Sequence, residues 1–265
     1  MSTFLQLAQK LKRETVDSGS ISTVVSQTGE NLRFVSWLID AWTEMQQDRD
    51  DWRWMRKSFT VNTVSGTGSY AYTACTDTVT AIAIARFSRW YRNTFKCYLT
   101  ASGVGAEYPL TWMEWEQFRR IYRYGTQTDG QPVHFSQDPT GAFVLGPKPS
   151  AVYVVSGDYQ IGPQTLALDA DEPEMPAKYH NLVVYEAMAK YGGSRIAPEA
   201  MVRAIAEGGR LRDALEREQL PAITWGRPLA EKHASFESAL LPTFSRYSSL
   251  TGQIVRISFW AYRPF

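Results

Sequence analysis

Cysteine, charge of one sign and long apolar runs are all scarce in this sequence, and each scarcity excludes a class of protein. Two cysteines among 265 residues, Cys75 and Cys97, provide neither a disulfide framework nor a zinc ligand set, and we expect both to be small buried hydrophobic residues. The formal net charge of +1 gives no support for a protein that grips DNA through its phosphates. No stretch approaches the about 20 apolar residues that span a bilayer, so we expect no membrane contact. The first residues lack the features of a signal peptide, which favours synthesis in a reducing cytoplasm.

Catalytic motifs are also missing. The three histidines, His134, His180 and His233, do not form a His-Glu-x-x-His zinc motif, and the sequence has no Walker lysine and no Gly-x-Ser-x-Gly nucleophile turn. The glycines at residues 66–71 loosely imitate a dinucleotide-binding loop, but strand-like sequence follows them where a helix is required, so a hairpin turn is the better interpretation. We therefore expect no enzymatic activity and no cofactor.

The first 56 residues have helical periodicity. A short amphipathic helix is predicted over residues 3–14 and a longer one over residues 28–54. The apolar stripe of the longer helix is Val35, Leu38, Trp42 and Met45, and Trp52 continues it. Its opposite side carries the charged residues Arg33, Asp40, Glu44 and Asp48, which predicts a solvated face.

Helical periodicity returns in residues 166–221. Two helices are predicted here, over residues 177–191 and 198–219, with Gly192 and Gly193 ending the first of them. We expect Leu182, Tyr185, Val202 and Ile205 to face the stripe of the longer N-terminal helix. Gly208 and Gly209 lie inside the last helix, where they would bend it or allow a close approach.

Between these helical regions, residues 57–165 change to the period of β-strands. Strands are predicted over residues 57–64, 78–87, 94–99, 133–136, 142–145 and 152–159. One short helix is predicted within this region, after a capping box formed by Thr111 and Glu114. The fold class is therefore α+β: a helical bundle of about four helices (residues 1–56 and 166–221) with a large, mostly antiparallel β-rich insertion (residues 57–165) and an extended C-terminal arm (residues 222–265).

Two polar clusters resemble ligand sites, and both have a plainer interpretation. Asp169, Asp171, Glu172 and Glu174 could bind Ca²⁺, but they lack the glycine turn of a calcium loop and suit the entry to a helix, so we expect no metal. Arg119, Arg120 and Arg123 could bind phosphates; cations near a helix end more often interact with the carbonyl dipole there.

The order of these parts resembles a known family. The features that carry the resemblance are a short helix, a second one that leads to Trp-x-Trp-Met at residues 52–55, a β-rich region, and an acidic, proline-containing entry to two more helices. The run Gly-Pro-Lys-Pro at residues 146–149 leads through Asp158-Tyr159 to Tyr179-His180. Over residues 1–220 the chain resembles the head-to-tail adaptor proteins of tailed bacteriophages, also called connector or head-completion proteins.

The resemblance implies a structural protein of the virion neck. Such adaptors have a helical-bundle core and form a ring, usually of twelve subunits, beneath the portal protein; DNA passes through the ring without base-specific contacts, and a tail protein attaches below. In several relatives the C-terminal arm reaches the portal. The corresponding arm here is aromatic, net positive and weakly periodic, which suits a segment that orders on a partner. The candidate portal-binding residues are Trp225, Arg227, Phe244, Arg256, Trp260, Arg263 and Phe265.

Two other functions compete with the adaptor interpretation. The first is a tail terminator or tail-tube component, which is also structural but forms rings of a different subunit number. The second belongs to another class: a β-rich ligand- or glycan-binding module. Aromatic residues stack on sugar rings when they are exposed, and Tyr70, Tyr72, Trp90 and Tyr91 are the candidates in the β-rich region.

Overall fold

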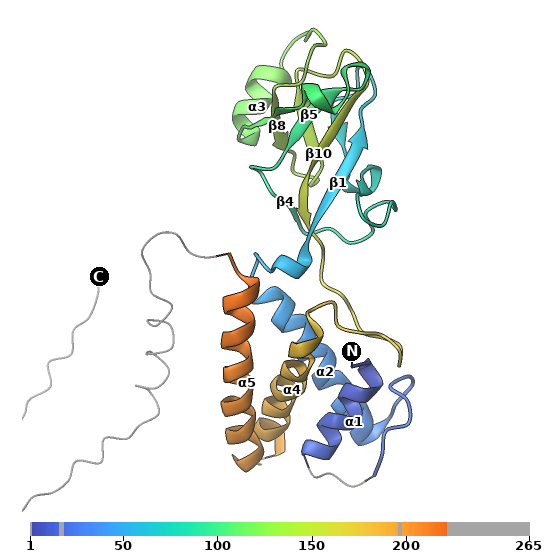
Figure 1. Cartoon of the computed structure of the whole chain (residues 1–265), viewed down its shortest axis with the longest axis vertical. Helices are drawn as coiled ribbons and strands as arrows, with labels where there is room; N and C mark the ends of the chain where they lie inside the picture. Colours follow the sequence, from blue (N-terminus) through green and yellow to red (C-terminus); the bar gives the residue numbers. More distant parts are fainter. Residues whose placement is uncertain (1, 16–18, 196–197, 222–265) are drawn as a thin grey trace, which may run out of the picture. The chain divides into compact units, whose positions relative to one another are not determined.

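The protein is an α+β protein with helices and two β-sheets, as the sequence predicts at this level (Figure 1). The computed structural model describes residues 2–15, 19–195 and 198–221, which belong to the first of two compact units of the chain, residues 1–222. The helices are α1 (Phe4–Glu14), α2 (Gly29–Gln47), α3 (Trp115–Tyr122), α4 (His180–Arg195) and α5 (Pro198–Gln219). Among the described helices, none has the length and apolar character needed to cross a bilayer.

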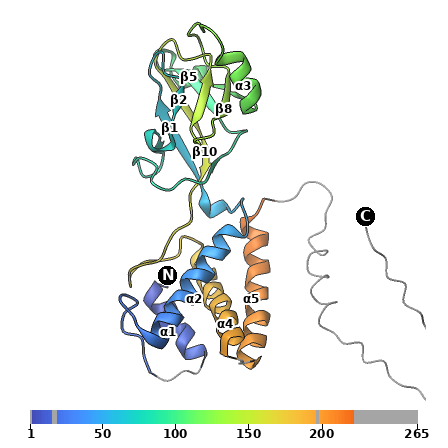
Figure 2. The same ribbon diagram turned by 180° about the vertical axis from the view of Figure 1, so that it is seen from behind.

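Helices α1, α2, α4 and α5 pack on one another and are called the helical group below (Figures 1 and 2). Helix α1 begins at the predicted place because Thr3 and Gln6 form a capping box, in which each side chain bonds to the other residue's backbone amide. The predicted stripe of α2 is buried, with Leu38 and Trp42 fully inaccessible to solvent. Leu182 and Val183 of α4 are buried equally completely.

Helix α2 is shorter than the sequence predicts. It ends at Gln47, and the chain then turns so that the indole Nε1 of Trp52 donates a hydrogen bond to the carbonyl oxygen of Met45 over 3.0 Å. The Trp52 ring stacks on Trp54, with 4.3 Å between ring centroids, and is buried. Trp52 therefore belongs to the core as predicted but does not belong to the helix. The helix ends without a glycine or proline, so the sequence contains no strong stop signal.

The packing between α4 and α5 corrects two predictions. Gly192 does not end α4, which continues to Arg195; a Cβ atom on Gly192 would lie 2.8 Å from the Cβ of Met201 in α5. On α5, Ala204, Gly208 and Leu215 are buried, with Gly208 against Tyr185 of α4, whereas Val202 and Ile205 are 67% and 59% exposed. The prediction that Val202 and Ile205 face the core was wrong. The two helices approach closely, so small side chains occupy the contact and the larger β-branched ones point outward.

Replacing Gly192 with alanine tests this close approach. We expect the substitution to lower the free energy of unfolding by about 1–3 kcal/mol, because the new methyl group would overlap the Met201 Cβ and backbone. Gly193→Ala is the matched control: no atom lies within 4 Å of its added Cβ, and alanine is the better helix former. Chemical denaturation of both variants measures the difference, and equal stabilities would contradict the close contact.

The strands between α2 and α4 form two sheets. A six-stranded sheet has the order β3-β1-β10-β5-β6, with β4 also paired to β10, and a four-stranded sheet has the order β2-β9-β8-β7. All strand pairs are antiparallel except β7 with β8. The strands are β1 (Arg56–Asn62), β2 (Ser69–Tyr70), β3 (Thr76–Asp77), β4 (Arg89–Trp90), β5 (Lys96–Leu99), β6 (Tyr108–Pro109), β7 (Thr111–Trp112), β8 (His134–Gln137), β9 (Phe143–Gly146) and β10 (Tyr153–Gln160).

Five of the six predicted strands are found, and the one predicted over residues 78–87 is wrong. This segment is a turn held by the Asp77 carboxylate, which accepts hydrogen bonds from the backbone amides of Val79 and Thr80 over 2.9 and 2.8 Å. Ala81 has a positive φ of 56°, which a regular strand does not allow. Val79 and Ile82 are 81% and 67% exposed in this turn, whereas Ile84 is buried just after it, so the β-branched residues that predicted a strand do not form one.

The predicted capping box of α3 is also absent. Thr111 lies in β7, where it pairs with His134 of β8, and α3 begins after Glu114 without a side-chain cap bond. The helix itself was predicted correctly and packs through Phe118, which is buried. Thr111 lies in the short strand β7 because it pairs there with β8, a strand more than twenty residues further along the chain. The local sequence does not show that this partner is nearby.

Aromatic rings from both sheets fill the space between them. Phe59 of β1 lies 5.9 Å from Phe143 of β9, and Phe95 stacks on Phe135 of β8 at 4.0 Å, measured between ring centroids. Trp90 contacts Phe59, Phe95 and Phe143. Much of the aromatic content of this chain is therefore used inside the β-rich region and does not by itself indicate contacts with other proteins.

The polypeptide enters and leaves the β-rich region at neighbouring points. Arg56, the first residue of β1, is the register partner of Gln160, the last residue of β10. Just beyond the strands, the amide of Ile161 donates a hydrogen bond to the carbonyl oxygen of Met55 over 2.9 Å. The two connections to the helical group therefore lie side by side.

Candidate functional site

The seven residues predicted to bind the portal lie outside the described residues. They are Trp225, Arg227, Phe244, Arg256, Trp260, Arg263 and Phe265. The last described residues before them are the C-terminal end of α5, followed by Leu220 and Pro221. The candidate site is therefore built from that end of α5 and from the contacts that hold α5 in place.

The last turn of α5 is attached to the residues just before α4. The Glu218 carboxylate accepts a hydrogen bond from the Tyr179 hydroxyl over 2.7 Å and forms an ion pair with Lys178. Arg53, from the short helical turn after α2, donates to the carbonyl oxygen of Glu218 over 3.3 Å. Hydrogen bonds from Lys178 and Tyr179 lower the pKa of Glu218, so this carboxylate is charged at neutral pH. The C-terminal end of α5 thus has a defined position on the helical group.

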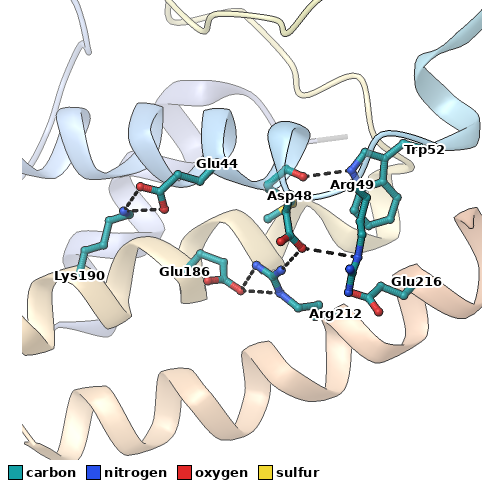
Figure 3. Close-up of polar contacts among 9 residues, drawn as sticks. Glu44, Asp48, Arg49, Trp52, Glu186, Lys190, Arg212 and Glu216 are labelled. Atoms are coloured by element: carbon teal, nitrogen blue, oxygen red, sulfur yellow. Dashed lines mark hydrogen bonds and ion pairs between the residues drawn. The ribbon is translucent and has the colours of Figure 1, made fainter. Parts of the chain in front are cut away.

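A network of ion pairs joins α2, α4 and α5 (Figure 3). Arg212 of α5 contacts Asp48 at the end of α2 and Glu186 of α4, each over 2.9 Å. Lys190 of α4 holds both carboxylate oxygens of Glu44 at 2.6 and 2.7 Å. Each of the three helices therefore forms at least one charged contact with another.

A second pair lies beside Arg212. Arg49, just after α2, contacts Glu216 over 3.3 Å, and the Glu216 side chain is only 10% exposed. Burial by itself would lower the pKa of Arg212, but the charge and hydrogen bonds of Glu186, with the charge of Asp48, raise it, so Arg212 stays charged. These contacts fix the position of α5 relative to its neighbours.

This network was missed at the level of sequence. Glu44 and Asp48 were assigned to a solvated face of α2, whereas the structure places them against α4 and α5. A signal was present: charged residues recur four positions apart at 44 and 48, at 186 and 190, and at 212 and 216, which places two charges on one face of each helix. The signal does not identify partners, because the same spacing also occurs on solvated faces.

Arg212→Ala tests how much the network contributes. We expect the free energy of unfolding to fall by about 2 kcal/mol, between the values typical of exposed and of buried pairs, because the Arg212 side chain is 28% exposed. Arg210→Ala is the matched control, since its pair with Glu207 is on the surface and the Arg210 side chain is 76% exposed; we expect less than about 0.5 kcal/mol. Urea denaturation at low and high salt measures both, and equal effects would show that the network adds no stability.

The aromatic residues proposed for sugar stacking do not form a platform. Tyr70 and Trp90 are buried, and Trp90 donates its indole N–H to the carbonyl oxygen of Gly141 over 3.0 Å. Tyr72 is half-buried and stacks on Phe87, and the ring of half-buried Tyr91 lies beneath the guanidinium groups of Arg56 and Arg89. The glycan interpretation required exposed rings, so these positions do not support it.

The acidic cluster before α4 is used for internal hydrogen bonds. Asp169 accepts from the amide of Val24 over 2.6 Å, and Asp171 accepts from the amides of Ala167 and Leu168 over 2.7 and 2.8 Å. The bonds from Leu168 and Ala167 lower the pKa of Asp171. Glu174 is paired with Arg86. Within the described ranges, no group of three or more possible metal ligands is found.

The remaining candidates are the two cysteines, which are buried in the core, and the three arginines near α3, which lie away from the ion-pair network. Burial raises the pKa of the Cys75 thiol to about 12 and also raises that of Cys97, as expected for small buried hydrophobic residues. Arg119, Arg120 and Arg123 are exposed on and just after α3. They belong to the β-rich region and are not part of the network in the helical group.

Comparison with known proteins gives one clear result. The sequence model of a family described as SU10 adaptor protein matches residues 2–231, which is most of the chain. No curated protein matches the sequence at a significant level. The matched region contains the helical group, the whole β-rich region and the first residues after α5.

Proposed function

The chain belongs to the SU10 adaptor protein family, and from this premise we propose that it is a head-to-tail adaptor that forms a ring beneath the phage portal. The ring would contain about twelve subunits, extend the DNA channel and present a surface to the first tail protein, as a component of the virion neck. The observation that carries this proposal is the family match over residues 2–231.

Three parts of the chain have separate tasks in this proposal. Residues 1–56 and 166–221 form a helical bundle that builds the ring, and the ion pairs of Arg212 and Lys190 support it by making the bundle a stiff unit. Residues 57–165 are an inserted lobe that enlarges the outside of the ring. Residues 222–265 reach the portal through the aromatic and basic residues named above, and the anchored end of α5 directs them.

The inserted lobe should be separable from the helices. Because Arg56 and Gln160 are register partners, residues 57–159 can be replaced by a short glycine-serine linker without moving the two ends apart. We expect the shortened protein to keep a cooperative thermal transition and the circular dichroism of the helical group. Loss of the helical signal would show that the β-rich region and the helices fold only together.

Electron microscopy of the purified protein, alone and with isolated portal, tests the proposed function. A twelve-fold ring that stacks on the portal supports the adaptor. A six-fold ring that does not bind the portal would instead support the tail terminator or tail-tube alternative. Free portal with no bound protein would contradict both the ring position and the task assigned to the arm.

A further inference from the structure

Helix α5 carries an exposed apolar stripe beside the face that packs on α4. Its members are Val202, Ile205, Ala206 and Gly209, each of which lies three or four residues from two of the others, so they share one face of the helix. Val202 and Ile205 are 67% and 59% exposed, and a shallow hollow on this face is lined by Pro198, Glu199, Val202, Arg203 and Ala206. A helix that packs inward through Ala204, Gly208 and Leu215 and also has an apolar outer face has the pattern of an element between two packed surfaces.

The first turns of α2 have a smaller exposed surface at the same end of the helical group. Leu32 and Arg33 are exposed there, Leu32 by 48%, and the Arg33 side chain by 65%. Two successive residues near the C-terminal end of α4 contact both helices. Tyr191 stacks on Phe34 of α2, with 5.7 Å between ring centroids, and Gly192 abuts Met201 of α5. The first turns of α2 and α5 therefore flank one end of α4 and begin at the same level.

We propose that the apolar stripe of α5 packs against the first turns of α2 in a second copy of this chain. The proposal rests on the proposed ring, and it names the contact that would close it. In a cyclic ring each subunit uses two different surfaces, one for each neighbour. Rotation about the ring axis preserves the level of each element, so two surfaces at the same level of the helical group can meet when its helices run along the axis.

The charges beside the two surfaces are complementary. Glu199 and Arg203 both line the hollow beside the α5 stripe, but Arg203 is already paired with Glu14 of α1 in the same chain over 2.8 Å, whereas Arg33 lies beside Leu32 on α2. Arg33 is only loosely paired with Glu30 in its own helix, at 3.9 Å. A contact that places Leu32 against Val202 brings Arg33 near Glu199 of the neighbour, and opposite charges around an apolar contact determine which surfaces associate.

Cysteine cross-linking tests the contact directly, because the two natural cysteines are buried and give no background. We expect full-length Val202→Cys/Leu32→Cys protein to form a ladder of disulfide-linked oligomers under conditions in which the wild type forms rings. A mixture of the two single variants should give dimers only, and each single variant alone should give none. A dimer from Val202→Cys alone would indicate a two-fold contact between identical faces and would overturn the proposal.

Charge variants supply a second measurement. Val202→Glu should weaken self-association at least about tenfold, because a carboxylate would enter an apolar contact. Val79→Glu, at an 81% exposed position in the β-rich region, is the matched control and should assemble normally. Glu199→Lys should also weaken assembly, and adding Arg33→Glu should restore it.

The remaining outcomes separate the contact from the function. Intact rings without any cross-link would overturn the α5–α2 contact and leave the adaptor function standing. Rings that survive Val202→Glu but no longer bind the tail protein would assign the stripe to that protein instead. Amide protection of Val202 that disappears on truncation after Pro221 would assign it to residues 222–265. Absence of rings in the wild type, with and without portal, would overturn both proposals.

Discussion

Replacing Trp42 with alanine will lower the free energy of unfolding by about 3–5 kcal/mol and leave little soluble protein. Trp42 lies in the C-terminal half of α2, is fully buried and is among the largest described buried side chains. Its indole Nε1 has no hydrogen-bond partner among the described residues, so the effect comes from lost packing and the cavity left behind. Denaturation of the purified variant, or the soluble fraction where it cannot be purified, measures this loss.

Trp42→Phe is the matched variant for this position. It retains an aromatic ring in the same site, so we expect less than half of the loss caused by alanine. An alanine variant within about 1 kcal/mol of the wild type would mean that the helical group does not depend on this stripe. A phenylalanine variant as unstable as the alanine variant would mean that the shape of the indole, more than its buried volume, determines the packing.

Truncation after Pro221 will leave a folded protein that no longer attaches to the portal. The described contacts of the helical group do not require residues 222–265: α5 is held by Arg212 and, at its end, by Glu218. The thermal transition should therefore be nearly unchanged. Binding should fall by on the order of 10²-fold or more, because the proposed ring would lose all its arms at once and with them the mutual increase in effective concentration.

Co-sedimentation with DNA-filled heads measures this attachment, and leakage of DNA from the heads is a second readout. Trp260→Ala combined with Phe265→Ala removes two proposed anchors while keeping the length of the arm, so it distinguishes specific contacts from mere reach. We expect weaker binding from this double variant than from the full chain, and stronger binding than from the truncated one. Attachment of the truncated protein at wild-type level would show that the arm is not the portal-binding element.

Ring formation and portal binding are proposed to depend on different residues, so they can be tested separately. The contact proposed for Val202 and Leu32 concerns neighbouring subunits, whereas Trp260 and Phe265 are proposed for the portal. Comparing Val202→Glu with the truncated protein therefore distinguishes two cases. In the first, the protein forms rings but does not attach to the portal; in the second, it attaches weakly because it does not form rings.

Local sequence was enough to predict the elements whose signals lie within a few residues. Helix α1 begins at Thr3 because its capping partner Gln6 is three residues away. The stripe from Val35 to Met45 has helical spacing, so its members share a face, and an apolar face of this size is buried. Five strands were found near their predicted positions for the same reason, since alternation along the chain is a local property.

The sequence by itself thus determined the α+β class, the place of most helices and strands, and the resemblance to phage adaptors. Only the tertiary structure decided which neighbour each face meets. Because α4 and α5 lie close together, Val202 and Ile205 point outward. Glu44 and Asp48, predicted to be solvated, instead form ion pairs with α4 and α5. Likewise, Thr111 pairs with β8 and does not cap α3 as predicted, and the Trp52 ring folds back onto the end of α2. The physical reason is common to all four: periodicity records which side chains share a face, but the distance and chemistry of the surface opposite depend on residues far away in the chain.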